Sequence, residues 1–191
     1  MEDKKQEISV AVLMGGRSSR MGQDKGLLEY RGKSMVEHVL NVGNSLSKDV
    51  FLVGNNKGYG QFGYNVFSDI PVGKGPLKGI LTALYHARHA HVLVLGCDMP
   101  HYSTDVANKM LSHGSKNVTL IPQINDMYQP LSGLYHTNAY TDVLHQLEKG
   151  TYKIMDALEH IEWQPVLFNE GEFPQKSFFN INSKTDLTQQ P

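Results

Sequence analysis

Short apolar runs and longer amphipathic stretches alternate through the first two thirds of the chain. The apolar runs are rich in Val and Leu and stop at turn-forming residues, as expected of buried β-strands. They cover residues 8–13, 49–53, 64–67, 91–95 and 117–121. The amphipathic stretches have the apolar spacing of helices and cover residues 34–46, 76–87 and 103–111. This alternation predicts an α/β fold with a mostly parallel sheet and helices on both faces.

The first helix has a recognisable start. Ser34 and Glu37 form a capping box, in which the serine side chain bonds an amide of the first turn and the glutamate reaches back. The helix should run to about Leu46. Its inner face would carry Met35, Val39, Val42 and Leu46. Upstream, residues 25–33 predict a strand or a tight hairpin that closes at Gly32.

Beyond Pro122 the pattern changes to shorter elements. We expect extended pieces at 127–130 and 133–135, helices near 138–147 and 152–160, late strands at 166–168 and 178–181, and a final helix capped within 183–186. The sequence has no repeat, low-complexity tract or linker. We therefore expect one domain, 1–191, with a nucleotide-binding half of about 7–121 and an acceptor-binding half of about 122–191.

Composition narrows the protein class. The chain has 191 residues, of which 40% are hydrophobic and 19% charged, with a formal net charge of -1. This balance argues against general attraction to nucleic acid or to an anionic membrane. One cysteine excludes an internal disulfide and a zinc-thiolate cluster. With no membrane-length apolar run and no signal-peptide core near the N-terminus, we expect a cytoplasmic protein.

A glycine-rich basic loop follows the first predicted strand. Gly15 and Gly16 carry no side chain, so another molecule can approach their backbone amides closely. Arg17, Arg20 and Lys25 add cationic donors beside those amides. Exposed N–H groups and several positive charges suit a polyphosphate. The loop therefore predicts a binding site for a nucleoside triphosphate.

Two carboxylates follow other predicted strands. Asp98 comes after the apolar run at 91–95, and Asp69 follows the run at 64–67. Ligands of open α/β sheets sit beyond the carboxyl ends of the strands, so these groups should gather beside the glycine loop. Asp98 there suits Mg²⁺, which takes one or two carboxylates plus phosphate oxygens; the alternative is a cap for the helix entered at Ser103. Asp69 either contacts the nucleotide or stabilises the turn before Pro71.

Several other motifs have simpler explanations. Gly32-Lys33-Ser34 resembles the end of a P-loop, but that pattern needs a glycine where Leu27 stands. Gly73, Gly75 and Gly79 lack the spacing and the preceding strand of a dinucleotide site. Three histidines at 86, 89 and 91 are better explained as a solvated helix end than as a zinc site. Cys97 beside a carboxylate is a weak nucleophile and fits a buried structural role, and Trp163 fits a packing role.

The stretch 13–25, LMGGRSSRMGQDK, resembles the L-A-G-G-x-S-x-R-M-G-x-D-K signature of the molybdenum cofactor guanylyltransferases, in the nucleotidyltransferase superfamily. The likeness continues in order through 75–79, 97–100, 129–131 with 134–135, and 180–183 with 186–187. It spans nearly the whole chain and implies a three-layer, Rossmann-like fold. The first loop marks the superfamily, and the Asn-Ile-Asn and Gln-Pro-Leu segments narrow the resemblance toward molybdopterin enzymes.

The resemblance also implies roles for residues. Leu13, Met14 and Gly15 would border the guanine nucleotide, and Lys25 would bind its phosphates. Asp69 would contact the nucleotide, and Asp98 would hold Mg²⁺. The 75–79 motif adds Gly75, Pro76 and Leu77 to the substrate-binding residues, while Asn180 and Asn182 would face the pterin. Lys25, Asp98 and Arg20 would be the catalytic residues.

This chain departs from the family pattern at several positions. Met14 stands where alanine is usual, Lys78 replaces a small residue and Gly133 replaces an alanine. A nucleotide-contacting asparagine of some members falls near Gly54, so Asn55 or Asn56 would serve only with a shifted register. These changes bear on contacts to the base more than on phosphate chemistry.

The expected activity is transfer of GMP from GTP to the terminal phosphate of molybdopterin or of the molybdenum cofactor, with release of pyrophosphate, to form the guanine dinucleotide cofactor. GTP and molybdopterin would be the substrates, with transient contacts to the proteins that deliver the acceptor and receive the product. One alternative is another nucleotidyltransferase on the same scaffold, either a CTP-dependent molybdopterin cytidylyltransferase or a sugar-phosphate nucleotidyltransferase. The other alternative is a non-catalytic nucleotide-binding regulator.

Overall fold

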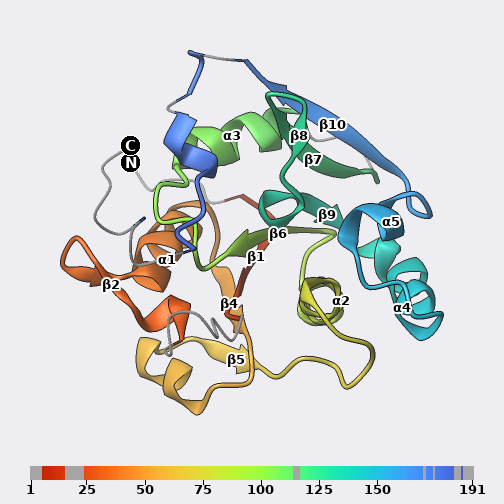
Figure 1. Ribbon diagram of the computed structural model, residues 1–191, viewed down its shortest axis with the longest axis horizontal. Coiled ribbons are helices and arrows are strands. Elements are labelled where there is room, and N and C mark those ends of the chain that lie inside the picture. The colour runs from red at the N-terminus through yellow and green to blue at the C-terminus, as the bar shows by residue number, and fades with distance from the viewer. Residues whose placement is uncertain are drawn as a thin grey trace.

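The structure is a computed structural model that describes residues 6–15, 24–113, 117–169, 171–173, 175–182 and 186. An eight-stranded mixed sheet forms its centre, in the order β10-β7-β9-β6-β1-β4-β5, with β8 paired to β7. The strands are β1 (Ser9–Leu13), β4 (Asp49–Val53), β5 (Asn65–Phe67), β6 (His91–Gly96), β7 (Thr119–Ile124), β8 (Met127–Tyr128), β9 (Leu134–His136) and β10 (Trp163–Phe168). The α/β fold expected from the alternating pattern is confirmed (Figure 1).

The four strands of the N-terminal half lie side by side and parallel. β1 pairs with β4 on one side and with β6 on the other, and β5 follows β4. Their carboxyl ends therefore meet at one edge of the sheet. In the C-terminal half, β9 runs antiparallel to both β6 and β7, and β10 runs parallel to β7.

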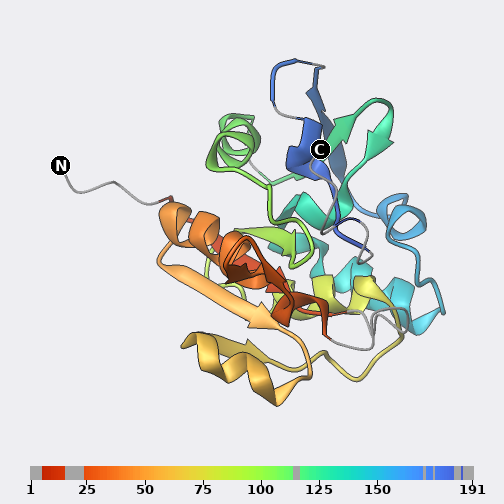
Figure 2. The same cartoon turned by 60° about the vertical axis from the view of Figure 1, so that its left-hand side comes forward.

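Helices cover the two faces of the sheet and give the fold three layers (Figures 1 and 2). α1 (Met35–Leu46) and α3 (Thr104–Ser112) pack on one face. α2 (Pro76–His86), α4 (Tyr140–Glu148) and α5 (Ile154–Leu158) pack on the other. Because side chains alternate along a strand, Val10 and Val12 join the first layer while Ala11 lies in the second.

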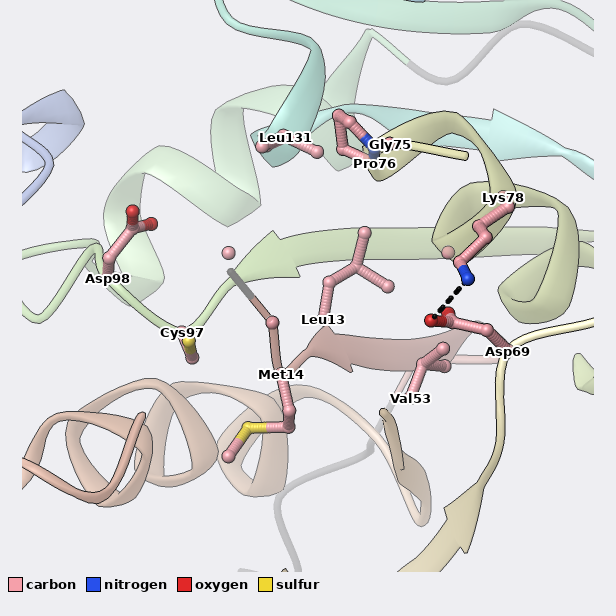
Figure 3. Close-up of a pocket in the computed structure, with 13 residues that line it drawn as sticks. Leu13, Met14, Val53, Asp69, Gly75, Pro76, Lys78, Cys97, Asp98 and Leu131 are labelled. Atoms are coloured by element: carbon pink, nitrogen blue, oxygen red, sulfur yellow. Dashed lines mark ion pairs between the residues drawn. The ribbon is translucent and has the colours of Figure 1, made fainter. Parts of the chain in front are cut away.

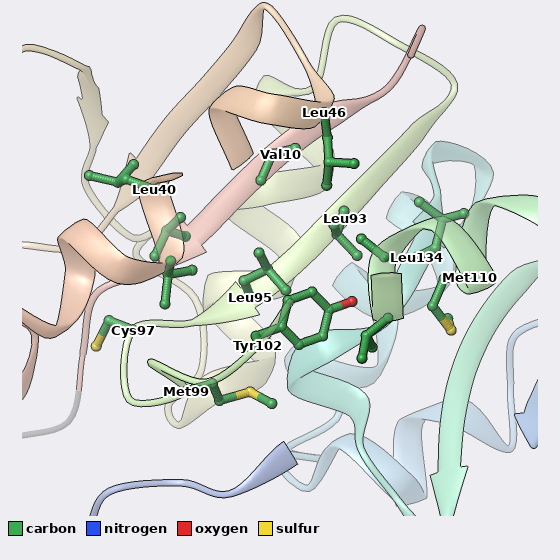
Figure 4. Close-up of a cluster of buried hydrophobic side chains, with 14 of the residues drawn as sticks. Val10, Leu40, Leu46, Leu93, Leu95, Cys97, Met99, Tyr102, Met110 and Leu134 are labelled. Atoms are coloured by element: carbon green, nitrogen blue, oxygen red, sulfur yellow. The ribbon is translucent and has the colours of Figure 1, made fainter. Parts of the chain in front are cut away.

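The core beneath α1 and α3 is continuous and apolar (Figure 4). Val10, Leu93 and Leu95 from the sheet meet Leu40 and Leu46 of α1 in this cluster. The apolar face expected of α1 is found, with Met35, Val39 and Leu46 buried. Burial of each such side chain contributes about 1.5–3 kcal/mol to folding. This packing fixes the sheet edge from which the site is built.

Two short segments connect the glycine-rich loop to α1. A 3-10 helix (Lys25–Leu27) comes first, where the sequence predicted an extended chain. The hairpin of β2 (Glu29–Tyr30) and β3 (Lys33–Ser34) follows and turns at Gly32, as expected. Asp24 caps the start of this 3-10 helix, since its carboxylate accepts from the Gly26 N–H at 3.1 Å. This turn directs the Lys25 side chain back toward the sheet edge.

The C-terminal segment differs from the expected strand at 178–181. Residues Gln175–Phe178 form a 3-10 helix, and the chain then continues without regular structure. Phe178 and Ile181 are buried while Phe179 is exposed, which is a turn-like spacing and not a strand alternation. The helix predicted within 183–186 falls mostly outside the described residues.

Across the described residues, none of the helices has the length and apolar character needed to cross a lipid bilayer.

Candidate active site

A cavity of about 410 Å³ opens where the parallel strands end (Figure 3). The residues that line it are Leu13, Met14, Gly15, Val53, Asp69, Gly75, Pro76, Lys78, Gly79, Gly96, Cys97, Asp98 and Leu131. They come from the ends of β1, β4 and β6, from the loop after β5, from the start of α2 and from the 3-10 helix Pro130–Ser132. The structure brings Gly15, Asp69 and Asp98 together at this edge of the sheet.

Lys25 and Asp98 meet beside this cavity. The Lys25 Nζ lies 3.4 Å from Asp98 Oδ2 and donates to Asn182 Oδ1 at 2.6 Å. Both charged side chains are largely shielded, with 15% of Lys25 and 20% of Asp98 exposed. Shielding strengthens their attraction relative to a fully solvated pair. The contact joins the N-terminal loop, the end of β6 and the C-terminal segment at one point.

The C-terminal segment is held against the Asp98 loop by its backbone. The Ile181 N–H donates to the Asp98 carbonyl oxygen at 2.9 Å, and Ile181 packs against Tyr30 and Met35. The Asn182 N–H donates to Asp186 Oδ2 at 2.8 Å. Among the described residues, no group bonds the buried side-chain oxygen of Asn180. A ligand with a hydrogen-bond donor would satisfy that oxygen.

A second charged group occupies the other end of the cavity. Asp69 Oδ2 lies 3.4 Å from the Lys78 Nζ and accepts from the Asn55 side-chain amide at 3.0 Å. The Asp69 N–H donates to Asn55 Oδ1 at 3.2 Å, so the two residues bond reciprocally. Asn55 thus reaches this site, and Asn56 instead donates to Asp24 at 3.0 Å.

Asp24 anchors the loop before Lys25. Its carboxylate accepts from Asn56 and from the hydroxyl of Tyr59, in addition to the Gly26 amide. Burial and the bond to Asp24 raise the pKa of Tyr59 above its usual range, so the phenol remains a donor. These contacts tie the end of the glycine-rich loop to the segment after β4.

Cys97 borders the cavity but is not a nucleophile. Burial, with the neighbouring Asp98 carboxylate, raises the pKa of its thiol to about 12. The thiol is therefore protonated at neutral pH and a poor nucleophile. The expected buried, structural role of Cys97 is confirmed, since it packs with Met14 and Met99 in the core.

The donor set suits a divalent metal shared with a ligand. Asp98 uses Oδ2 toward Lys25, while no described residue bonds its Oδ1. The described residues contain no group of three or more His, Cys, Asp or Glu side chains placed to hold a metal ion. A single carboxylate completed by phosphate oxygens fits Mg²⁺, which seldom uses an all-protein cage. A zinc site built from protein ligands alone does not fit this donor set.

The predicted site residues divide into four groups. Leu13, Met14, Gly15, Asp69, Gly75, Pro76 and Asp98 line the cavity. Lys25 lies beside Asp98 and bonds Asn182. Asn180 belongs to the same C-terminal segment as Asn182. Leu77 does not line the cavity, because its side chain is buried in the core beneath α2. Gly16, Arg17 and Arg20 lie outside the described residues.

Six residues that line the cavity are not among the predicted site residues, namely Val53, Lys78, Gly79, Gly96, Cys97 and Leu131. Val53 is the last residue of β4, so its position at the end of a parallel strand was a usable signal. Leu131 comes from the Gln-Pro-Leu segment, which was noted for other reasons. Lys78 was noted only as a departure from a family pattern, yet it carries a charge into the cavity.

Comparisons with known proteins identify the family of this chain. A family model described as a MobA-like NTP transferase domain matches residues 10–163. A relative from Clostridium perfringens named "Probable molybdenum cofactor guanylyltransferase" is 31% identical over 92% of this chain and 91% of its own. The "Molybdenum cofactor guanylyltransferase" of Pseudomonas fluorescens is 34% identical over 76% of this chain and 78% of its own.

The architecture also matches solved structures. The crystal structure of molybdopterin-guanine dinucleotide biosynthesis protein A from Archaeoglobus fulgidus has a TM-score of 0.77 and 26% sequence identity, covering 94% of this chain and 95% of that one. A protein from Aquifex aeolicus has a TM-score of 0.78 at the same 26% identity. The first of these matches covers more of the chain than the family model does.

Proposed function

The chain belongs to the family of MobA-like NTP transferase domains, and we propose that it transfers GMP from GTP to the terminal phosphate of molybdopterin. An acceptor phosphate oxygen attacks the α-phosphorus of GTP, the bond from that phosphorus to the bridging oxygen breaks, and pyrophosphate leaves with the electron pair. The product is a guanine dinucleotide form of the cofactor. The names of the relatives support this choice of substrates.

One observation supports the reaction most directly. The Lys25 ammonium contacts Asp98 and Asn182, so the loop suited to phosphates and the segment proposed for the acceptor converge on one charged group. A transferase must hold its two substrates in line at a common point. We therefore assign residues 7–121 mainly to the nucleotide and 122–191 mainly to the acceptor, with Lys25 at their junction.

The reaction needs charge neutralisation more than proton transfer. The acceptor is a phosphate monoester that is already largely ionised at pH 7, so no general base is required. Lys25, with Arg17 or Arg20, would neutralise charge on the leaving pyrophosphate. Asp98 would hold Mg²⁺, which when bound supplies positive charge and alignment at the reacting phosphates. The amides of Gly15 and Gly16 would cradle the triphosphate.

The proposal is tested by measuring pyrophosphate release from each of the four nucleoside triphosphates, with Mg²⁺ and with or without molybdopterin. We expect release only when GTP and molybdopterin are both present. Release with CTP instead would make the protein a cytidylyltransferase of the same scaffold. Tight GTP binding without any release would make it a non-catalytic nucleotide-binding protein.

A further inference from the structure

The cavity has two charged ends separated by an apolar middle (Figure 3). Asp98 lies at one end, and the Asp69–Lys78 ion pair lies at the other, with Leu13 between them. In the proposed reaction the Asp98 end takes the phosphates. The Asp69–Lys78 end is then left for the base.

The pair is fixed in place before any ligand binds. The Thr82 hydroxyl donates to the Lys78 carbonyl oxygen at 2.9 Å and accepts from the Ile70 N–H at 3.0 Å. One buried threonine therefore connects the first turn of α2 to the residue after Asp69. Asn55 fixes Asp69 from the other side through the two reciprocal bonds. A pre-organised pair can discriminate between ligands at little cost in ordering.

The carboxylate also retains capacity for a ligand. The bonds to Lys78 and Asn55 both go to Oδ2 of Asp69. Within the described part of the chain, Oδ1 has no hydrogen-bond partner, and it lies next to Gly79, where an added Cβ would be 3.8 Å away. Gly79 lines the cavity and leaves room on that side. Lys78 is only 27% exposed, and its ammonium carries three N–H donors beside Asp69.

A donor beside an acceptor matches the edge of one base better than the others. Guanine presents the carbonyl oxygen O6, and next to it the N1–H and N2–H donors. Adenine and cytosine present an amino donor in place of that carbonyl, which would face the Lys78 donors without an acceptor. Uracil has the carbonyl and one adjacent N–H but lacks the amino group that guanine adds.

We propose that Lys78 is a specificity-determining residue that donates to O6 of guanine, while Asp69 accepts from the N1–H and N2–H groups. This inference rests on the proposed function for the position of the base, and it adds a residue that selects guanine. Because Lys78 stands where a small residue is usual in the family, its ammonium adds a contact that a small side chain lacks.

The test uses nucleotides altered at one position of the base. In 6-thio-GTP a sulfur, which is a weak acceptor, replaces O6, and in ITP the N2 amino group is missing. In Lys78→Met we expect kcat/KM for GTP to fall by about 10- to 100-fold, the usual worth of a hydrogen bond to a charged group. The value for 6-thio-GTP should change little, so the preference for GTP over 6-thio-GTP should largely disappear. The preference for GTP over ITP should persist, since Asp69 carries it.

Two further variants make the result specific. Lys74→Met makes the same chemical change four residues earlier, at an exposed lysine whose Nζ lies 5.0 Å from the Tyr152 ring centroid, and it should behave as wild type. Lys78→Arg keeps a cationic donor and should restore part of the selectivity for O6. Equal losses with GTP and 6-thio-GTP in Lys78→Met would overturn the inference, because Lys78 would then act only through Asp69 or on the phosphates. No loss with either nucleotide would also overturn it.

Failure of this inference is separable from failure of the proposed function. Equilibrium binding of the same nucleotides can be measured without molybdopterin. The difference in affinity between GTP and 6-thio-GTP then shows whether the protein recognises O6, even if no GMP is transferred. Selective loss of GTP binding in Lys78→Met without any transfer would keep the inference and reject the function. Transfer of GMP by a wild-type enzyme that binds GTP and 6-thio-GTP equally would keep the function and reject the inference.

Discussion

At the scale of single residues, Lys25 connects the end of β6 to the C-terminal segment. Its ammonium lies between the Asp98 carboxylate and the Asn182 amide oxygen, with 15% of the side chain exposed. In Lys25→Met we expect turnover to fall by about 100-fold or more, the usual effect of removing a group that stabilises developing charge. Steady-state pyrophosphate release measures the change. Lys48→Met, at an exposed lysine before β4, is the control, and a near-normal rate in Lys25→Met would refute the assignment.

The role of Asp98 as a metal ligand can be tested by the dependence of activity on Mg²⁺ concentration, in addition to the rate itself. If its carboxylate holds Mg²⁺, Asp98→Asn should raise the Mg²⁺ concentration needed for half-maximal activity by at least about 10-fold, since even outer-sphere partners have effects of that size. A Mg²⁺ titration of the transfer rate measures this midpoint. Asp126→Asn, in the exposed turn between β7 and β8, controls for loss of one negative charge. An unchanged titration would mean that Asp98 only pairs with Lys25.

The ends of the strands were predictable and the side-chain pairs around them were not. Asp69 and Asp98 follow apolar runs, and parallel neighbours bring such residues to one edge, so their common location followed from the pattern. The Lys78–Asp69 pair depends on how the first turn of α2 faces the loop after β5, which a local pattern does not encode. The placement of Asn55 against Asp69 depends on the same tertiary packing.

At the scale of elements, α1 shows how a local signal fixes a helix start. The Glu37 carboxylate accepts from the Ser34 N–H at 2.7 Å and from the Ser34 hydroxyl at 2.6 Å, and these bonds lower the pKa of Glu37. Ser34→Ala should lower the free energy of unfolding by about 1 kcal/mol. Denaturation in urea measures this, with Ser45→Ala on the exposed side of the same helix as control. Equal effects of the two changes would show that the cap contributes nothing of its own.

β9 brings a titratable group into the core. His136 is 6% exposed, its Nδ1 accepts from the Asn138 N–H at 3.2 Å, and its ring lies 4.8 Å from that of His91. Burial lowers the pKa of His136 below the ordinary value of 6.5, so the folded protein favours the neutral ring. The stability contributed by the neutral ring is present above pH 6.5 and is lost as the pH falls through the folded-state pKa.

This linkage predicts the direction of a pH effect. Between pH 6.5 and the lower folded-state pKa, His136 should cost up to about 1.4 kcal/mol of unfolding free energy for each pH unit. His136→Asn should reduce that slope in denaturation curves measured from pH 7.5 to 5. His160→Asn, at an exposed position after α5, should leave it unchanged. A slope that is identical in wild type and His136→Asn would contradict the buried-histidine explanation.

The C-terminal elements were harder to predict than the N-terminal ones. An apolar run at 178–181 indicated a strand, but that segment follows a 3-10 helix and bonds the Asp98 loop through the Ile181 amide. A run of only four residues is compatible with a strand and with a turn that follows a helix. The tertiary contacts of the segment decide between these two structures, and a local pattern does not contain them. β4 and α1 were predicted closely because their patterns are longer and each begins or ends at a clear signal.

At the scale of the whole molecule, the site lies where two halves of the chain meet, and the contact from Lys25 to Asn182 crosses between them at 2.6 Å. If the C-terminal segment serves the acceptor, Asn182→Ala should raise the KM for molybdopterin by about 10-fold, the worth of one hydrogen bond to a charged group. The GTP-dependent rise in melting temperature should stay close to that of wild type, because this rise depends only on the binding of GTP to the folded protein.

The other variants make this result specific. Lys25→Met should weaken both the binding of molybdopterin and the stabilisation by GTP, since its ammonium contacts groups of both halves. Asn138→Ala, at an exposed position in the 3-10 helix Thr137–Ala139, is a matched control away from the cavity. Loss of GTP protection in Asn182→Ala, with an unchanged KM for molybdopterin, would assign the segment to the nucleotide and would end the division of the chain into two binding halves.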